Sequence, residues 1–450
     1  MLSNFSKLKY FIHNKSTWIL RGQDSASATL QTVLTRTLII GVNVGTGIIT
    51  ARFLGAQGRG EQAAMILWPI FLANTLTFGL PTAVIYNFRK YPKDRSKLFA
   101  AALLLGTIAG LAATVLGIVL MPTLLKNYSE SSIGFARLLM LNSPIVLVQL
   151  IVLSALEANG DFSASNRLRL LIPTLTLLLL IGLLFTNSLN PYTSALAYIV
   201  NGIPVFFWTL IQLWRKIRPQ WQDLYRATKL LISYGLRSYG VSVLGTLASN
   251  IDQALVVGFL EPAAMGTYVV ALSLSKILNI FHNSLSTVLF PSAAARPLEE
   301  IIAMTGRAVR LNIASMILIG SAVIVASPLL LNLLYGSEFI SAVPVLRILI
   351  IGVVVNGAAM ILAQAFMASG SPGVVTALQG VGLALNVPLM VVLIPPLGLT
   401  GAALSLLLST TARLIFILFL FPTVLKRNPP SLIINREDII YLKQKLSASL

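Results

Sequence analysis

Long apolar runs separated by short polar connections dominate this sequence. Runs of about 20 apolar residues are long enough to cross a bilayer as a helix, and counting them gives twelve predicted spans. The first six cover residues 29–53, 63–88, 98–121, 133–157, 168–186 and 192–213, and the second six cover residues 230–258, 266–290, 308–333, 342–368, 374–394 and 398–421. The pattern predicts an all-α integral membrane protein with twelve transmembrane helices.

Several residues recur at a nearly constant distance in the two halves of the chain. The pairs are Ala158 and Ala368, Gly160 and Gly370, and Arg137 and Arg347, each 210 positions apart, and Gly60 and Gly266, 206 positions apart. Chance is the alternative explanation, because apolar sequences share Gly and Ala freely. Several matches in the same order favour a duplicated six-helix unit. Since six is even, both copies would enter the membrane in the same direction, as two parallel lobes.

The longest polar connection between spans, residues 214–229, divides the chain. We expect an N-terminal tail (1–28), an N-terminal six-helix lobe (29–213), a basic linker (214–229), a C-terminal six-helix lobe (230–421) and a C-terminal tail (422–450). In the last tail, one helical face carries Ile439, Leu442 and Leu446 beside Lys443 and Lys445. This pattern is typical of an interfacial helix on the cytoplasmic leaflet, with a solvated tail as the alternative.

Composition and charge support a bilayer protein and indicate its orientation. Apolar residues make up 56% of the chain and charged residues 10%, which is not a soluble composition. A net charge of +19 would suggest a nucleic-acid partner in a soluble protein, but membrane proteins collect Lys and Arg on cytoplasmic loops. Basic residues are concentrated in the two tails and in the connections after spans two and six. We therefore expect both termini in the cytoplasm and no nucleic-acid partner.

The sequence offers little material for catalysis or metal binding. It has no cysteine and two histidines, which excludes disulfides, thiolate metal sites and a His-rich metal centre. Its short external connections lack the acidic, His-containing cluster that a membrane-embedded transferase would need. We expect no catalytic residues, no metal and no cofactor, and hence a protein that is not an enzyme.

Charges inside the predicted spans are the candidate functional residues. Six are basic: Arg36, Arg137, Arg237, Lys276, Arg347 and Arg413. Only Asp252 is a clear acid there. Because a cation near the bilayer centre costs roughly 2.5–3.5 kcal/mol on insertion scales, the set needs water, partners or a ligand. We predict a hydrated cationic cavity that receives an anionic group such as a phosphate or pyrophosphate.

The alternatives differ from residue to residue. Lys276 lies near mid-depth, where the cavity interpretation is favoured. Arg36, Arg237 and Arg413 lie in the cytoplasmic halves of their spans, where a cavity and the membrane interface compete. These three join Lys276 as the predicted substrate-binding residues.

For each of three further charges the sequence leaves two roles open. Arg137 and Arg347 lie close to the external ends of their spans, so they are substrate ligands or structural residues that reach the interface. Asp252 is a candidate proton or sodium site, or an internal counter-ion with Lys276 as its candidate partner. Polar span residues such as Asn43, Asn250, Gln253 and Gln364 would set the selectivity of the cavity for the rest of its ligand, and they also serve helix packing.

Loose motifs along nearly the whole chain resemble a known family. They are FLGAQGRGEQA at 53–63, GLPTAVIYN at 79–87, LEANGDF at 156–162, YGL at 234–236, IDQALVVGFL at 251–260, GTYVVALSL at 266–274 and VLFP at 288–291. In order and spacing they resemble Wzx-type polysaccharide flippases of the multidrug/oligosaccharidyl-lipid/polysaccharide (MOP) exporter superfamily. The scarcity of acids differs from the drug-exporting branch, whose members commonly use acidic residues for cationic substrates.

This resemblance implies two lobes that move undecaprenyl-pyrophosphate-linked oligosaccharide across a bacterial plasma membrane. The implied partners are that lipid-linked oligosaccharide, the bilayer, and the polysaccharide polymerase and glycosyltransferases of the same pathway. Two other functions remain open: a proton- or sodium-coupled small-molecule antiporter of the same superfamily, and a membrane-bound polymerase or transferase. Loss of coupling on mutation of Asp252 would indicate the antiporter, and altered glycan linkages would indicate the enzyme.

Overall fold

The computed structural model describes residues 25–294, 296–433, 435 and 438, and these form helices joined by short connections. They divide into two compact units. The N-terminal unit contains the described residues up to Leu54 together with Glu61–Val243, and the C-terminal unit contains Gly55–Gly60 and the described residues from Leu244 onward. Two long helices, α2 (Ser25–Thr75) and α10 (Leu224–Phe259), contribute to both units.

Between α2 and α10, the N-terminal unit consists of helices connected by short turns. They are α3 (Leu80–Lys90), η1 (Pro92–Asp94), α4 (Arg95–Leu124), α5 (Glu130–Leu139), η2 (Met140–Asn142), α6 (Ser143–Ala158), α7 (Phe162–Phe185), α8 (Pro191–Val200) and α9 (Gly202–Ile217). Small residues bring α4 and α6 close together, since a Cβ on Gly110 would lie 2.4 Å from the Cα of Pro144. The predicted linker, 214–229, is non-helical only at 218–223.

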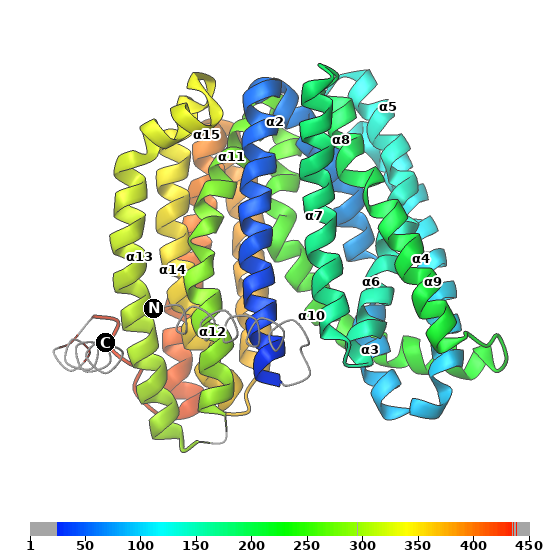
Figure 1. Cartoon of the computed structure of the whole chain (residues 1–450). Coiled ribbons are helices and arrows are strands. Elements are labelled where there is room, and N and C mark those ends of the chain that lie inside the picture. Colours follow the sequence, from blue (N-terminus) through cyan, green and yellow to red (C-terminus); the bar gives the residue numbers. More distant parts are fainter. Residues whose placement is uncertain (1–24, 295, 434, 436–437, 439–450) are drawn as a thin grey trace, which may run out of the picture. The chain divides into compact units, whose positions relative to one another are not determined.

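The C-terminal unit has a similar series of helices after α10. They are α11 (Pro262–Ile277), α12 (Asn279–Ala293), α13 (Leu298–Tyr335), η3 (Ser337–Ala342), α14 (Val343–Ala368), α15 (Gly373–Leu420) and the π-helical turn η4 (Phe421–Leu425). Figure 1 shows α13 and α14 side by side, and buried residues of α13, α14 and α15 share one hydrophobic core.

Nine of the described helices are long and apolar enough to cross a membrane, or ten if α11 and α12, which meet at 42°, form one broken span. The protein is therefore a multi-pass membrane protein. Two of the nine, Leu34–Thr75 and Gly373–Leu425, have 42 and 53 residues, about twice the length that one crossing requires. Counting these two as double crossings, and α11 with α12 as one span, gives twelve, the predicted number, which stays a prediction.

Each of these two long helices is interrupted at one glycine. Gly55 in α2 has φ 68° and Gly398 in α15 has φ 56°, both non-helical. A glycine has no Cβ to oppose such backbone angles, so the helix changes direction within one residue. The connection between predicted spans one and two, residues 54–62, contains the first of these junctions, and its residues other than Gly55 have helical backbone.

The turns after α6 and α14 are built alike, 210 positions apart. In one, Gly160 (φ 80°) donates its N–H to the carbonyl of Glu157 at 3.1 Å, and in the other Gly370 (φ 82°) donates to that of Met367 at 3.2 Å. The next residue donates to a carbonyl five positions back in both turns, as in a Schellman cap. The recurrence of Gly160 and Gly370 is therefore a recurrence of local structure, as a duplicated unit would produce.

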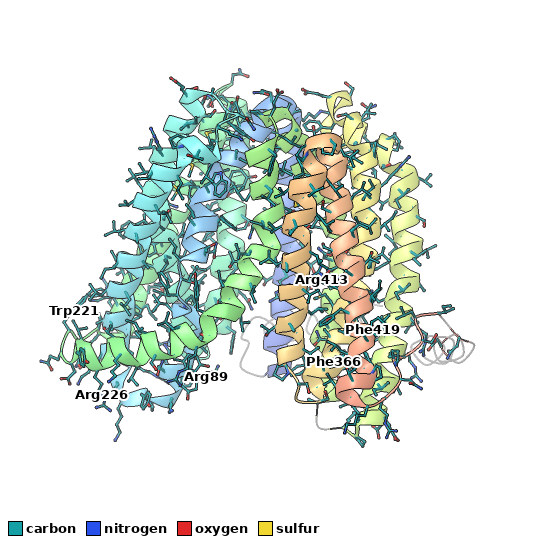
Figure 2. The ribbon with its side chains drawn as sticks, turned by 180° about the vertical axis from the view of Figure 1, so that it is seen from behind. Arg89, Trp221, Arg226, Phe366, Arg413 and Phe419 are labelled. Atoms are coloured by element: carbon teal, nitrogen blue, oxygen red, sulfur yellow. The ribbon has the colours of Figure 1, made fainter. Side chains whose placement is uncertain are left out.

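Arg89, Trp221 and Arg226 lie at the same end of the N-terminal unit (Figure 2). Arg89 belongs to the last turn of α3 and Arg226 to the first turns of α10. The basic connections after predicted spans two and six therefore meet at one end, as the charge pattern requires. That both termini lie in the cytoplasm stays a prediction. The residues of the predicted interfacial helix, Ile439 to Leu446, lie outside the described residues.

The described part of the C-terminal tail runs alongside the first half of α13. Arg427 pairs with Glu299 at 2.8 Å, and Pro430 packs over Gly306. Asp438, whose side chain is buried, accepts hydrogen bonds from Arg310 Nε at 2.5 Å and Nη2 at 2.9 Å. These hydrogen bonds hold the pKa of the Asp438 carboxyl below its usual value.

Asp438 makes the stability of this segment depend on pH. Because its folded pKa is lowered, the stabilisation is complete above the unfolded pKa of about 3.9 and is lost as the pH falls through the folded pKa. Hydrogen bonds to a charged group contribute about 1.5–3 kcal/mol to stability, and we expect Asp438→Asn to remove part of this contribution. The variant should expose the segment to limited proteolysis at pH 7, and its melting temperature should fall less than that of wild type as the pH is lowered. Glu299→Gln, in the exposed pair, is the control and should change neither. If the melting temperatures of wild type and Asp438→Asn fell equally as the pH is lowered, this role of Asp438 would be contradicted.

Candidate functional site

The C-terminal unit contains a cavity of about 350 Å³ that both polar and apolar residues line. Residues of α10, α11, α14 and α15 line it, together with Asn279 at the start of α12. Its charged, amide and threonine side chains are those of Asp252, Lys276, Asn279, Asn356, Gln379, Thr410 and Arg413. Three of the charged residues predicted from the sequence therefore meet at one cavity, although they are separated by up to 161 positions in the chain.

Arg413 enters the cavity from the second part of α15 and lies well away from both ends of that helix (Figure 2). Its Nη2 donates to Oδ1 of Asn356 on α14 at 3.0 Å. Its Nε is buried and has no hydrogen-bond acceptor among the described residues. The stem of the side chain passes over Gly382, where a Cβ would lie 2.5 Å from Cδ of Arg413. The guanidinium is thus held in place and retains an unused donor.

Lys276 lies in the last turn of α11, where the chain bends by 42° into α12. The bend brings Lys276 and Asn279 to the cavity wall, and the Lys276 side chain is exposed. Of the ion pairs within 4.0 Å in the described part of the chain, none includes Lys276. A cation within a span that has no acidic partner is suited to an anionic ligand.

Asp252, on α10, is the acid of the cavity and is 5% exposed. Its Oδ2 accepts a hydrogen bond from the hydroxyl of Tyr268 on α11 at 2.9 Å. Its Oδ1 is buried without a donor among the described residues. The sequence suggested Lys276 as the direct partner, but the structure places Tyr268 in that position. Asp252 and Lys276 both line the cavity but do not form an ion pair within 4.0 Å.

Two of the predicted substrate-binding residues lie outside this cavity. Arg36 on α2 and Arg237 on α10 are exposed residues of the N-terminal unit, and Arg237 Nη2 donates to Oγ of Ser233 at 3.1 Å. Of the polar residues suggested for sugar selectivity, Asn43, Asn250, Gln253 and Gln364 are likewise absent from its lining, which contains Asn356 and Gln379 instead.

Arg137 and Arg347 make equivalent contacts in the two units. Arg137 Nε donates to the carbonyl of Ile118 on α4 at 3.2 Å, and Arg347 Nε donates to Oγ of Ser327 on α13 at 3.3 Å. Each arginine therefore donates a hydrogen bond to the long helix that precedes it in its unit. The two acceptor residues are almost as far apart in the chain as the two arginines are. This geometry favours the structural alternative for both residues.

The sequence interpretation did not identify which faces of α14 and α15 line the cavity. On α14 the lining residues Gly352, Asn356 and Met360 are spaced four apart, and on α15 Thr410 is three residues before Arg413. Residues at these spacings share one face of a helix. A search for polar residues on the same helical face as Arg413 would have selected Thr410, but not Asn356 or Gln379.

The cavity has the chemistry of an anion-binding site. Two cations and one carboxylate leave it with one excess positive charge, and Arg413 still has an unused donor to offer. Guanidinium and ammonium groups are the usual protein ligands for phosphate oxygens. Throughout the described residues, no group of three or more His, Asp or Glu side chains is arranged to hold a metal ion.

The fold is that of the MOP superfamily. A lipid II flippase MurJ in an inward closed conformation superposes with a TM-score of 0.75 at 14% identity, over 90% of this chain and 88% of that one. An inward-facing multidrug resistance MATE family transporter gives 0.70 at 14%, over 90% and 98%. A MOP superfamily transporter from Pyrococcus furiosus, whose binding pocket is described as reversed in polarity, gives 0.62 at 15%, over 91% and 98%.

No curated protein matches the sequence. A family model does match it, over residues 49–344, and that model describes polysaccharide biosynthesis proteins. Together with the fold, this match confirms the resemblance to the MOP superfamily, while the narrower Wzx type stays a prediction. Because the match covers more than half of the chain, this protein belongs to the polysaccharide biosynthesis protein family.

Proposed function

We propose that this protein is a flippase that moves undecaprenyl-pyrophosphate-linked oligosaccharide from the inner to the outer leaflet of a bacterial plasma membrane. The observation that carries the proposal is the cavity in the C-terminal unit, where Lys276 and Arg413 both lack an acidic partner within 4.0 Å among the described residues. Membership of the polysaccharide biosynthesis family supports a saccharide-bearing substrate. A pyrophosphate supplies the negative charge that the cavity lacks.

In the proposed cycle, the pyrophosphate engages Lys276 and Arg413 from the cytoplasmic side. A cavity of about 350 Å³ has room for the pyrophosphate and few other groups. Asn356 and Gln379 therefore contact the sugar next to the pyrophosphate. The lipid tail stays in the bilayer, and the two six-helix lobes alternate access. A membrane potential negative inside favours outward movement of an anion by roughly 2.3 kcal/mol per charge per 100 mV. No bond is made or broken in this cycle.

The test is leaflet-to-leaflet movement of a labelled polyprenyl-pyrophosphate oligosaccharide in liposomes containing the purified protein. We expect movement that protein-free liposomes lack and that an imposed potential, negative inside, accelerates in the outward direction. A labelled neutral polyprenol should not be moved. Absence of movement for every lipid-linked sugar tried, under either sign of potential, would refute the proposal.

One observation favours a second candidate, a proton- or sodium-coupled antiporter. Asp252 lies in the same cavity, nearly fully buried, with one carboxylate oxygen that has no donor among the described residues. Asp252→Asn separates the candidates, since the amide keeps the size of the side chain but not its charge. A potential-driven flippase should retain movement of the lipid-linked sugar, whereas an antiporter should lose its dependence on the cation gradient. Cation-driven drug efflux without sugar-lipid movement would establish the antiporter.

A further inference from the structure

A second cavity, a groove of about 800 Å³ in the N-terminal unit, has no part in the proposed transport cycle. It lies between α7 and α9, beside the turn that follows α6. Its lining includes Asp161, Arg167, Leu171, Trp208, Gln212 and Lys216. All of these residues belong to the N-terminal unit, so the groove is separate from the cavity that holds Lys276 and Arg413.

The groove is charged at one end and apolar at the other. Arg167 lies near the start of α7 and Lys216 in the last turn of α9, so both line the end nearest the turn at Asp161. Leu171 is one turn further along α7, and Trp208 is eight residues before Lys216. At 1.5 Å per residue, the apolar end lies roughly 6–12 Å from the cations. This is the polarity of a lipid, with a head group followed by a hydrocarbon chain.

The apolar end of the groove is exposed along candidate membrane spans. Trp208 is 55% exposed and Leu171 is 37% exposed, although both lie within candidate membrane spans. Their exposed neighbours on α9, Phe207 and Ile211, are also apolar. Exposed apolar side chains within a span contact hydrocarbon, and tryptophan is enriched near the interface where chains and head groups meet.

The charged end carries one excess positive charge. Lys216 Nζ lies 3.9 Å from Oδ2 of Asp161, whose Oδ1 accepts the N–H of Ala164 and so caps α7. Arg167 Nε donates to the backbone carbonyl of Ser163 at 3.3 Å. Within the described part of the chain, no acid lies within 4.0 Å of Arg167. The terminal nitrogens of Arg167 are therefore available to a phosphate, and the net charge matches one phosphodiester.

We propose that this groove binds one anionic phospholipid, with its phosphate between Arg167 and Lys216 and one acyl chain along Leu171 and Trp208. Basic pockets between spans on the cytoplasmic side recognise acidic lipid head groups in this way. Gln212, exposed at the same wall, offers an amide to the hydroxyls of a glycerol head group. The site is independent of the proposed transport function, because binding here requires no movement of the lipid.

The proposal is tested by native mass spectrometry of the full chain in detergent, titrated with phosphatidylglycerol or with phosphatidylcholine. We expect wild type to retain one phosphatidylglycerol per chain, with an affinity at least about tenfold higher than for zwitterionic phosphatidylcholine. This comparison needs no variant. Equal retention of the two lipids would overturn the proposal. Tighter retention of a polyprenyl phosphate than of phosphatidylglycerol would also overturn it, since the groove would then serve substrate.

A charge-matched pair of variants locates the site. Arg167→Gln with Lys216→Gln should weaken phosphatidylglycerol binding at least about tenfold. Arg226→Gln with Lys229→Gln removes two exposed cations from α10, outside the groove, and should leave binding unchanged. Melting temperatures of both variants check that the fold is intact. If both pairs weaken binding equally, the lipid is held by general surface charge and the groove is not its site.

Discussion

Lys276→Ala is expected to slow movement of the lipid-linked oligosaccharide by roughly ten- to a hundredfold. Lys276 lines the cavity without an acid within 4.0 Å among the described residues, so the proposed pyrophosphate is its partner. A hydrogen bond to a charged group contributes about 1.5–3 kcal/mol, and 1.4 kcal/mol corresponds to a factor of ten. Arg413→Ala should have an effect of the same size, with an additional loss of stability because Asn356 loses its donor.

Liposome flux under an imposed potential measures this effect. Lys276→Arg keeps the charge and should restore most of the rate, which a purely structural role for Lys276 would not predict. Arg427→Gln is the control, since Arg427 is an exposed cation of the same unit that pairs with Glu299 outside the cavity. If Lys276→Ala transports as fast as Arg427→Gln, Lys276 does not contact the substrate.

Gly266→Ala is expected to destabilise the C-terminal unit by about 2–3 kcal/mol or more. Gly266 on α11 packs against the residues that follow Gly55 in α2, and a Cβ on Gly266 would lie 2.0 Å from the carbonyl oxygen of Ala56. The contact is reciprocal, because a Cβ on Gly60 would lie 1.6 Å from the carbonyl oxygen of Pro262. Overpacking costs about 1–3 kcal/mol and occasionally more, and a clash with backbone cannot be relieved by rotating a side chain.

The melting temperature of the purified protein measures this prediction. Gly380→Ala is the matched control, since Gly380 is a helical glycine of α15 in the same unit with no atom within 4 Å of an added Cβ. It should be neutral or stabilising, because alanine favours a helix by about 1 kcal/mol over glycine. Equal melting temperatures for the two variants would show that the helices separate enough to admit a methyl group.

Much of the architecture followed from local patterns. Apolar runs located the helices because a bilayer leaves a backbone few other ways to satisfy its hydrogen bonds. The pairing of Gly160 with Gly370 marked two turns with the same cap, because left-handed backbone angles select glycine. The junctions at Gly55 and Gly398 lie in or beside connections between predicted spans, and Pro395 and Pro396 precede the second one. What the sequence did not predict is that helical backbone continues up to a single glycine on both sides of each junction.

The charged residues of the site were partly predictable. Asp252, Lys276 and Arg413 were selected because a charge within a span is costly without a partner, and all three line the cavity. The same argument also selected Arg36 and Arg237, which lie outside it. Asn356 and Gln379 were missed because an uncharged amide within a span serves helix packing as readily as binding.

The sequence by itself determined that this is a helical membrane protein, where its helices run, which residues recur at a nearly constant distance in its two halves, and which residues carry a charge within a span. The tertiary structure decided which of those residues meet, that Tyr268 and not Lys276 bonds to Asp252, and that a groove lies between α7 and α9. The physical reason is that spans such as α14 and α15 are apolar on every side. The sequences of such spans predict the length of each helix but not which side of it faces the protein interior. Contacts between segments far apart in the chain therefore determine which side chains share a cavity.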